Sequence, residues 1–263
     1  MILIIFLFGI IAILALGIFR DVLTFFFREA KSYAFPYFFP EKHVSYLQKH
    51  FTFYQKLPEK SKKIFIYKVA RFMSSKEFIA RQMSAVTDEM KVLISASAAQ
   101  LTFGFRGITF PYFYKIFVFP ESFYNHQNRA FHKGEVNPKL KAIALSWKDF
   151  VDGYLREDGR NLGLHEMAHA LRLENRIMNN EYGFLEGWVL EEWERQAQRT
   201  MKEINSGNET FFREYGGVNN EEFFAVAVEN FFERPVQFQQ KHPHTYRTLC
   251  RLLRQDPALL TAA

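Results

Sequence analysis

Hydrophobic and polar positions divide the chain into a continuous apolar segment at the N-terminus and a longer part with periodic patterns. Residues 1–19, MILIIFLFGIIAILALGIF, contain no charged residue and no proline. A helix of this length, rising about 1.5 Å per residue, spans the roughly 30 Å hydrocarbon core of a bilayer. A secretory signal peptide is disfavoured, because no Lys or Arg precedes the run and no clear small-x-small cleavage site follows it. We therefore expect a retained transmembrane helix at residues 1–19.

The residues after this segment indicate its orientation. Arg20, Arg28 and Lys31 follow the apolar run, and only the amino terminus is basic before it. The positive-inside rule then places residues 20–263 in the cytoplasm, with the protein as a single-pass protein of the cell membrane. Aromatic and basic side chains of residues 20–43 suit the headgroup region, so we expect a juxtamembrane segment there.

Residues 44–263 have the pattern of one mostly helical α/β domain. Apolar residues at helical spacing predict helices at 44–83 (broken near Pro58), from Asp88 to about Gly104, around 161–173, and at 184–205, 221–235 and 242–257. Aromatic and β-branched residues predict strands within 108–120 and a short buried strand at 140–147. The polar ranges 124–139, 149–161 and 206–220 are expected to be loops.

Composition narrows the classes of function. The 31 Phe and 12 Tyr residues predict a core dominated by aromatic side chains. The net charge of +6 is spread along the chain, and no run of Lys or Arg alternates with aromatics, so nucleic acid is not an expected partner. A basic surface near anionic lipid is the simpler interpretation. With Cys250 as the single cysteine, neither an intramolecular disulfide nor a cysteine metal cluster can form.

The sequence LHEMAHAL carries the first candidate chemistry. On a helix, His165 and His169 lie one turn apart on one face, so both imidazoles can bind one zinc ion. Glu166 lies about 100° further around the helix and can act as general base on a water held at the metal. The structural alternative is two histidines on a partly solvated helix face.

A catalytic zinc ion usually has three protein ligands and one water, so a third ligand is needed. Three glutamates of the following predicted helix are candidates, although their pairing with arginines is typical of a solvated face: Glu186, Glu191 and Glu192. The helix predicted at 221–235 is apolar nearly all round, and a buried carboxylate there is costly unless it is paired or binds a metal. Glu222 and Glu229, seven residues apart, share one face of it, and spacing alone does not choose between them.

Three blocks, HEMAHAL, EYGGVNNEEFFAVAVENFFERPVQF and HPHTYRTLCRLLRQDP, resemble the Mlc titration factor A family of zinc metallopeptidases. The similarity covers roughly residues 45–258 and is strongest from residue 140 onward. It implies a zincin-like domain in which helices surround a small sheet beside the active-site helix. It also implies one zinc ion per chain and the following site residues: His165, His169 and Glu222 as ligands, Glu166 as general base, and Glu229 in a supporting role.

The resemblance has two further implications and two departures. Tyr215 matches a tyrosine near the family's active site, where a phenol can donate a hydrogen bond to an oxyanion. The strand at 140–147 matches the strand beside the active-site helix, where zincin-type sites often add an extended peptide to a sheet edge. In contrast, Arg172 stands where the family commonly has Asp, which reverses a charge near the site. The apolar segment 1–19 is an addition to the family pattern.

These observations predict a membrane-anchored, zinc-dependent peptidase that hydrolyses peptide bonds with a zinc-activated water and Glu166 as general base. The alternative implied by the resemblance is a tethered protein that sequesters a transcriptional repressor of glucose uptake or another partner, with weak or incidental peptidase activity. A Glu166→Gln exchange distinguishes them, because it removes the base and leaves a partner-binding surface intact.

Overall fold

The computed structural model describes four long stretches of the chain, residues 39–125, 129–177, 184–209 and 211–261. It also describes a few scattered positions between residues 16 and 27. In these stretches no helix combines the length and the hydrophobicity needed to cross a bilayer. The transmembrane helix expected at residues 1–19, and much of the juxtamembrane segment 20–43, lie outside the described residues.

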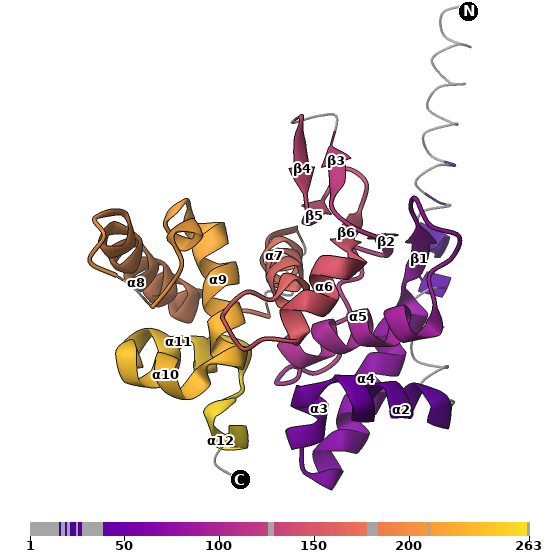
Figure 1. Cartoon of the computed structure of the whole chain (residues 1–263), viewed down its shortest axis with the longest axis horizontal. Helices are drawn as coiled ribbons and strands as arrows, with labels where there is room; N and C mark the ends of the chain where they lie inside the picture. Colours follow the sequence, from indigo (N-terminus) through magenta and orange to yellow (C-terminus); the bar gives the residue numbers. More distant parts are fainter. Residues whose placement is uncertain are drawn as a thin grey trace, which may run out of the picture.

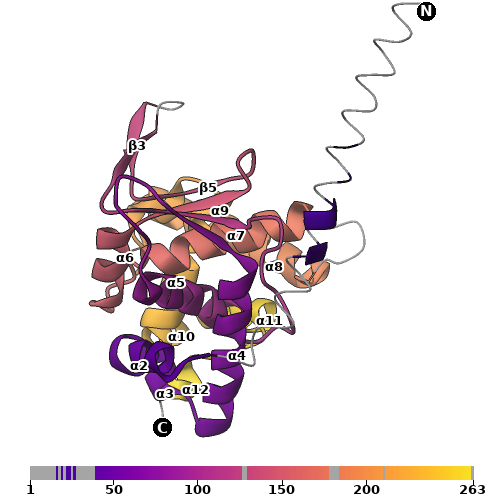
Figure 2. The same cartoon turned by 90° about the vertical axis from the view of Figure 1, so that its right-hand side faces the viewer.

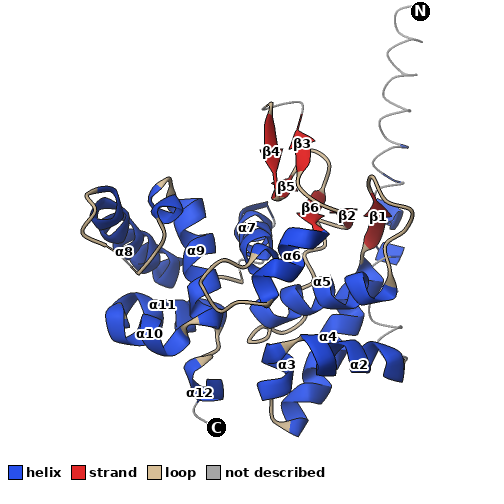
Figure 3. Cartoon of the chain, viewed as in Figure 1, coloured by secondary structure: helices blue, strands red, loops and turns tan. Residues whose placement is uncertain are grey.

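Helices make up most of the described chain and surround a small sheet (Figures 1 and 3). The helices are α2 (Glu41–His50), α3 (Thr52–Lys56), α4 (Glu59–Ser75), α5 (Asp88–Leu101), α6 (Trp147–Tyr154), α7 (Leu162–Ile177), α8 (Gly187–Asn205), α9 (Asn220–Glu233), α10 (Pro235–Lys241), α11 (Pro243–Leu253) and α12 (Ala258–Thr261), with a 3-10 turn, η1, at Glu214–Gly217. The strands are β1 (Glu77–Ala80), β2 (Lys115–Phe119), β3 (Phe123–Asn125), β4 (Ala130–His132), β5 (Gly134–Asn137) and β6 (Ala142–Ser146). The predicted fold class, a mostly helical α/β domain with a small sheet, is confirmed for this part of the chain.

The main sheet has the order β1-β2-β6-β5. Strands β1, β2 and β6 are parallel, and β5 pairs with β6 in the antiparallel direction. Strand β6 is buried at all five positions, because it lies in the interior of the sheet. Strand β5 is an edge strand, and it lies above α7 in the view of Figure 2.

The hydrogen bonds of β5 determine which of its backbone groups are free. The Ser146 N–H donates to the Lys133 carbonyl at 2.7 Å, one residue beyond the Gly134↔Leu145 pair. In an antiparallel ladder, hydrogen-bonded and non-hydrogen-bonded pairs alternate. Gly134 and Val136 are therefore in non-hydrogen-bonded positions, and their N–H and C=O groups point away from β6 toward the open edge.

Helix α7 lies at the centre of the molecule and packs against α5, α9 and the two strands β5 and β6 (Figure 1). Its partner α9 is buried from Phe223 to Phe231, as its nearly continuous apolar sequence predicts. The small residue Gly163 permits close packing of α7, since a Cβ there would lie 2.6 Å from the ring of Phe150. These contacts hold α7 and α9 side by side in the core.

Four predicted elements are wrong. Residues 77–80 form β1 and not helix, because they pair with β2. The expected loop at 124–139 contains β3, β4 and β5, and the first part of the loop expected at 149–161 belongs to α6. Of the range 108–120, where strands were predicted, only the residues of β2 form a strand. The strand at 140–147 exists as β6 but is interior, so the edge beside the active-site helix is β5.

Candidate metal centre and active site

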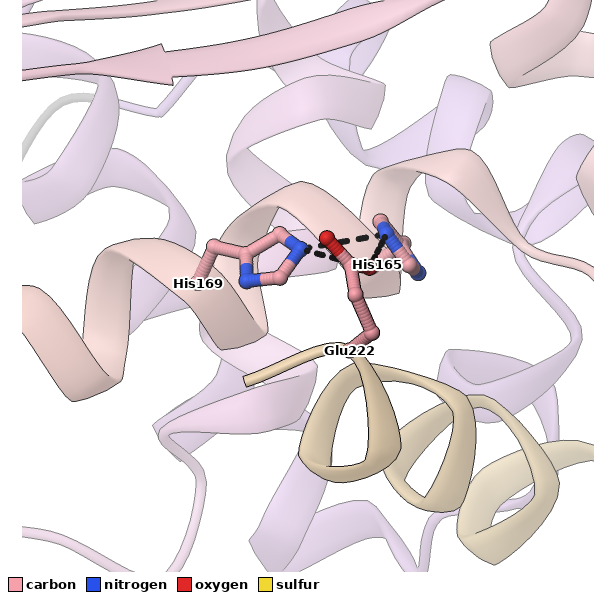
Figure 4. A group of neighbouring side chains, drawn as sticks. All are labelled: His165, His169 and Glu222. Atoms are coloured by element: carbon pink, nitrogen blue, oxygen red, sulfur yellow. Dashed lines mark hydrogen bonds and ion pairs between the residues drawn. The ribbon is translucent and has the colours of Figure 1, made fainter. Parts of the chain in front are cut away.

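Two helices bring three side chains with metal-binding atoms together (Figure 4). His165 Nε2 and His169 Nε2, one turn apart on α7, are 3.1 Å from each other. Glu222 reaches between them from α9, and its Oε2 atom is 3.2 Å from His165 Nε2 and 3.3 Å from His169 Nε2. The three atoms form a nearly equilateral triangle, and this group could hold a metal ion.

The ligand types of the triangle and the distances between its atoms fit a zinc ion. Ligands at about 2.0–2.1 Å in a tetrahedron are roughly 3.3 Å apart, close to the distances seen here. Glu222 Oε2 is buried and accepts no hydrogen bond of acceptable geometry, which is unfavourable unless a cation satisfies it. Two histidines and one glutamate are a set of protein ligands found in catalytic zinc sites.

Capping interactions at two helix starts position the ligands. Asn161 precedes α7, and its side-chain oxygen accepts a hydrogen bond from Leu164 N–H at 3.0 Å. Asn219 precedes α9 in the same way and accepts hydrogen bonds from the N–H groups of Glu221 and Glu222, each at 2.9 Å. Glu222 therefore lies in the first turn of α9, where the helix dipole favours a carboxylate.

Glu229 holds the first histidine in the orientation that a metal requires. Its side chain is completely buried, and Oε1 lies 2.5 Å from His165 Nδ1. This contact assigns the Nδ1 proton to a hydrogen bond with Glu229 and leaves the lone pair of Nε2 directed into the triangle. Burial lowers the pKa of His165, but the carboxylates of Glu222 and Glu229 outweigh it and raise the pKa to about 10. A cation at the triangle would take the place of that proton.

Arg213 fixes Glu229 in turn. Its two terminal nitrogens bind the two carboxylate oxygens at 2.8 and 2.7 Å, a bidentate pair. Asn161 N–H donates to the same carboxylate at 3.0 Å. The negative charge of Glu229 is thus balanced inside the core, which makes its complete burial possible.

Glu166 lies beside the triangle under the edge strand. Its side chain is buried, and burial raises its pKa, as suits a general base. Gly134 of β5 packs directly against it, since a Cβ at Gly134 would lie 2.4 Å from Glu166 Oε1. The edge strand can therefore approach the carboxylate only because residue 134 has no side chain.

Tyr215, on η1, lies beside the first histidine. Its ring centre is 6.0 Å from that of His165, and its side chain is about half exposed. Burial of part of the ring and the neighbouring carboxylate of Glu222 raise the pKa of Tyr215, so the phenol keeps its proton. A protonated phenol at this place can donate a hydrogen bond to a bound oxygen.

A cleft of about 1240 Å³ opens at this centre. Its lining includes His165, Glu166 and Tyr215, together with residues of the β4–β5 strand and of the segment before α7. This volume is at the upper end of the range of about 300–1,000 Å³ that is common for ligand pockets, or above it.

Other predicted candidates lie elsewhere. Glu186 is 3.5 Å from Arg254, and Glu192 forms an exposed pair with Arg195 at 2.6 Å. Neither of them, nor the exposed Glu191, belongs to the metal-binding group. The solvated-face interpretation therefore describes these three glutamates better than metal ligation.

Arg172, the residue that departs from the family pattern, points toward α8 and α9. It is buried and lies 3.2 Å from Glu194 and 3.4 Å from Glu221. These two carboxylates balance its charge.

Sequence reasoning missed Arg213, Asn161 and Gly134. Arg213 and Asn161 are polar residues in expected loops, and nothing local in the sequence indicates that they contact Glu229 from 16 and 68 residues away. The one available signal for Gly134 was its position at the start of a short Val-containing segment, since an isolated glycine in a strand often marks a close approach.

Comparison with known proteins places the chain among its relatives. A model of the family described as glucose-regulated metallo-peptidase M90 matches residues 27–254. An uncharacterised protein of Synechocystis sp. is 26% identical over 227 residues, which cover 79% of this chain and 81% of that protein. Mlc titration factor A of Salmonella arizonae is 28% identical over 139 residues (51% of this chain and 55% of the relative), and that of Yersinia pestis is 31% identical over 121 residues (44% of each).

The chain thus spans about half, or less, of the length of the two Mlc titration factors A in these alignments. The family match covers most of the chain and includes the helices that carry the metal-binding group. The predicted family resemblance is confirmed: the chain belongs to the glucose-regulated metallopeptidase family M90, which has distant homologues named Mlc titration factor A.

Proposed function

We propose that the protein is a zinc-dependent peptidase whose metal ligands are His165, His169 and Glu222. The observation that carries this proposal is the triangle of three facing ligand atoms, 3.1–3.3 Å apart, with a buried Glu222 oxygen that lacks a hydrogen bond. A zinc ion bound there would supply a Lewis acid that polarises the peptide carbonyl and acidifies a water molecule.

The residues around the metal site have distinct tasks in this proposal. Glu166 accepts a proton from the attacking water and then delivers it to the leaving amine. Tyr215 donates a hydrogen bond to the oxygen that gains negative charge during the attack. Glu229 and Arg213 keep the His165 imidazole in the orientation that directs Nε2 to the metal.

The open edge of β5 supports a peptide as the substrate. The N–H and C=O groups of Gly134 and Val136 face away from β6, and Gly134 touches Glu166. An extended peptide can pair with these groups as an additional strand. Its scissile bond then comes next to the general base.

Zinc content and hydrolysis test the proposal together. We expect about one zinc ion per chain in the full-length protein by mass spectrometry, and a loss of zinc affinity of at least about 100-fold in Glu222→Ala. Glu166→Gln should retain zinc and lose peptide hydrolysis by at least about 100-fold. An absence of zinc from the wild type, even after incubation with zinc, contradicts the proposal.

A second function is suggested by the names of relatives, since two of them are called Mlc titration factor A. In this alternative the chain binds a regulatory protein, and hydrolysis is weak or incidental. Binding of such a partner should survive Glu166→Gln, whereas proteolysis should not.

A further inference from the structure

The strand that borders the metal site continues beyond it. Only Lys133 separates β4 from β5, so residues 130–137 run almost without interruption along the cleft. In the view of Figure 1, β4 lies to the left of β3, as β5 lies to the left of β6. A peptide paired with the open edge of β5 would therefore continue along β4.

Phe131 of β4 belongs to this continuation of the edge. It is 75% exposed, the highest value among the large hydrophobic side chains of the described residues, and it lines the same cleft as His165 and Glu166. Tyr124 of β3 packs against it edge to face, with ring centres 5.3 Å apart, and is itself 42% exposed. Phe131 is thus an exposed aromatic side chain in a cleft whose lining is otherwise mostly charged or polar, and Tyr124, outside that lining, supports it.

The direction of β5 decides which part of the substrate meets this pair. A peptide antiparallel to β5 runs toward β4 in its own N-to-C direction. Phe131 precedes Gly134 by three residues, about 10 Å along a strand. The bond beside Glu166 is near Gly134, so Phe131 lies opposite the second or third residue after that bond.

We propose that Phe131, supported by Tyr124, forms a binding subsite for a large apolar side chain two or three residues C-terminal to the cleaved bond. Preferred substrates are then extended peptides with an aromatic or branched aliphatic residue at that position. This inference rests on the proposed peptidase function and adds a substrate class to it. The occupant is a substrate side chain because the apolar surface is continuous with the catalytic cleft and with the open strand edge.

Cleavage of a peptide library by the zinc-loaded full-length protein tests the inference. Mass spectrometry of the products should show Phe, Tyr, Leu or Ile enriched at the second or third position after the cleaved bond. Two matched peptides, with Phe or Gly at the enriched position, then give the ratio of kcat/KM values. We expect a ratio of about 5 to 30 for the wild type, falling toward 1 in Phe131→Ala.

Leu155→Ala is the matched control, because Leu155 is 74% exposed and does not line the cleft. It should keep the wild-type ratio. Binding of the same two peptides to zinc-loaded Glu166→Gln, with and without Phe131→Ala, provides a readout independent of hydrolysis. Zinc content of every variant shows that the metal site is intact.

The outcomes separate the subsite from the peptidase function. Hydrolysis with no apolar preference, or with a preference that Phe131→Ala leaves unchanged, overturns the subsite and keeps the peptidase. Peptide binding that depends on Phe131 without any hydrolysis overturns the peptidase, and with it the position of the subsite relative to a cleaved bond, while Phe131 remains a site for an apolar peptide side chain. If the protein neither binds nor hydrolyses the peptides, both the subsite and the peptidase function are overturned. Loss of self-association or of vesicle binding in Phe131→Ala, with unchanged peptide preference, assigns the aromatic pair to a second copy or to lipid and also overturns the subsite.

Discussion

At the scale of single residues, the orientation of one imidazole depends on residues from three parts of the chain. His165 is held by Glu229 of α9, and Glu229 is held by Arg213 and by the backbone of Asn161. The arginine contributes two parallel hydrogen bonds, which a lysine cannot form.

Arg213→Lys should therefore weaken zinc binding by about 10- to 100-fold, as is typical when a group that orients a metal ligand is changed. Competition with a chromophoric chelator measures the affinity. Arg195→Lys is the control, since Arg195 forms an exposed pair with Glu192. Equal zinc affinities of Arg213→Lys and the wild type would show that Glu229 keeps its position without the bidentate pair.

Gly134→Ala tests the close approach of β5 to the general base. A Cβ at this position would lie 2.4 Å from Glu166 Oε1, so the carboxylate must move. We expect kcat for peptide hydrolysis to fall by about tenfold or more, with zinc content unchanged, because Glu166 is not a proposed ligand. Gly187→Ala, which meets no atom within 4 Å, should behave as the wild type. An unchanged kcat in Gly134→Ala would mean that the position of Glu166 is not critical.

At the scale of elements, α9 presents a line of carboxylates on one face. Glu222 reaches the metal-binding group, Glu229 orients His165, and Glu233 accepts hydrogen bonds from Gly159 N–H at 2.8 Å and Asn161 Nδ2 at 3.1 Å. Burial raises the pKa of Glu233 to about 8. One helix thus supports both the metal site and the segment that leads into α7.

The raised pKa of Glu233 predicts a pH dependence of stability. The folded state holds a proton on Glu233 between the ordinary pKa of 4.5 and about 8, whereas the unfolded state has lost it. The stabilisation is therefore present below pH 4.5 and is lost as the pH rises through 8. Urea unfolding between pH 5 and pH 9 should show a decline on the order of 4 kcal/mol for the wild type that Glu233→Gln lacks. Parallel slopes for both proteins would contradict the raised pKa.

The same scale shows which elements the sequence could predict. The helices α5, α7, α8 and α9 have long periodic or continuous apolar patterns, and their existence and approximate bounds agree with the prediction. Strands β1, β4 and β5 have three or four residues each, too few for a pattern. Strand β1 forms by pairing with the distant β2, whereas β4 and β5 pair with the neighbouring strands β3 and β6. The candidate ligands His165 and His169 could also be recognised from a local pattern, because they lie one turn apart on α7. Arg213 could not, because its role arises only when α9 packs against α7.

At the scale of the whole molecule, the apolar N-terminus predicts attachment to a membrane. Residues 1–19 have the length and composition of a single spanning helix, followed by Arg20 and Arg28. We propose a single-pass protein of the cell membrane with the peptidase domain in the cytoplasm.

Fractionation tests this arrangement. The full-length protein should stay with membranes during alkaline carbonate extraction, and a Leu7→Arg/Ile11→Arg double variant should not, because each arginine at the bilayer centre costs about 2.5–3.5 kcal/mol for insertion. Protease added to inverted membrane vesicles should digest the domain, whereas protease added to intact spheroplasts should not. Digestion in spheroplasts instead would reverse the proposed orientation.

The origin of the site in two distant helices also affects the protein during its synthesis. The histidines of α7 leave the ribosome more than fifty residues before Glu222, and Glu229 follows later still. Until α9 has been made and has packed against α7, the nascent chain has an incomplete set of proposed ligands and nothing to orient His165. Under the proposed peptidase function, a chain still attached to the ribosome cannot cleave itself or neighbouring nascent proteins until α9 is in place.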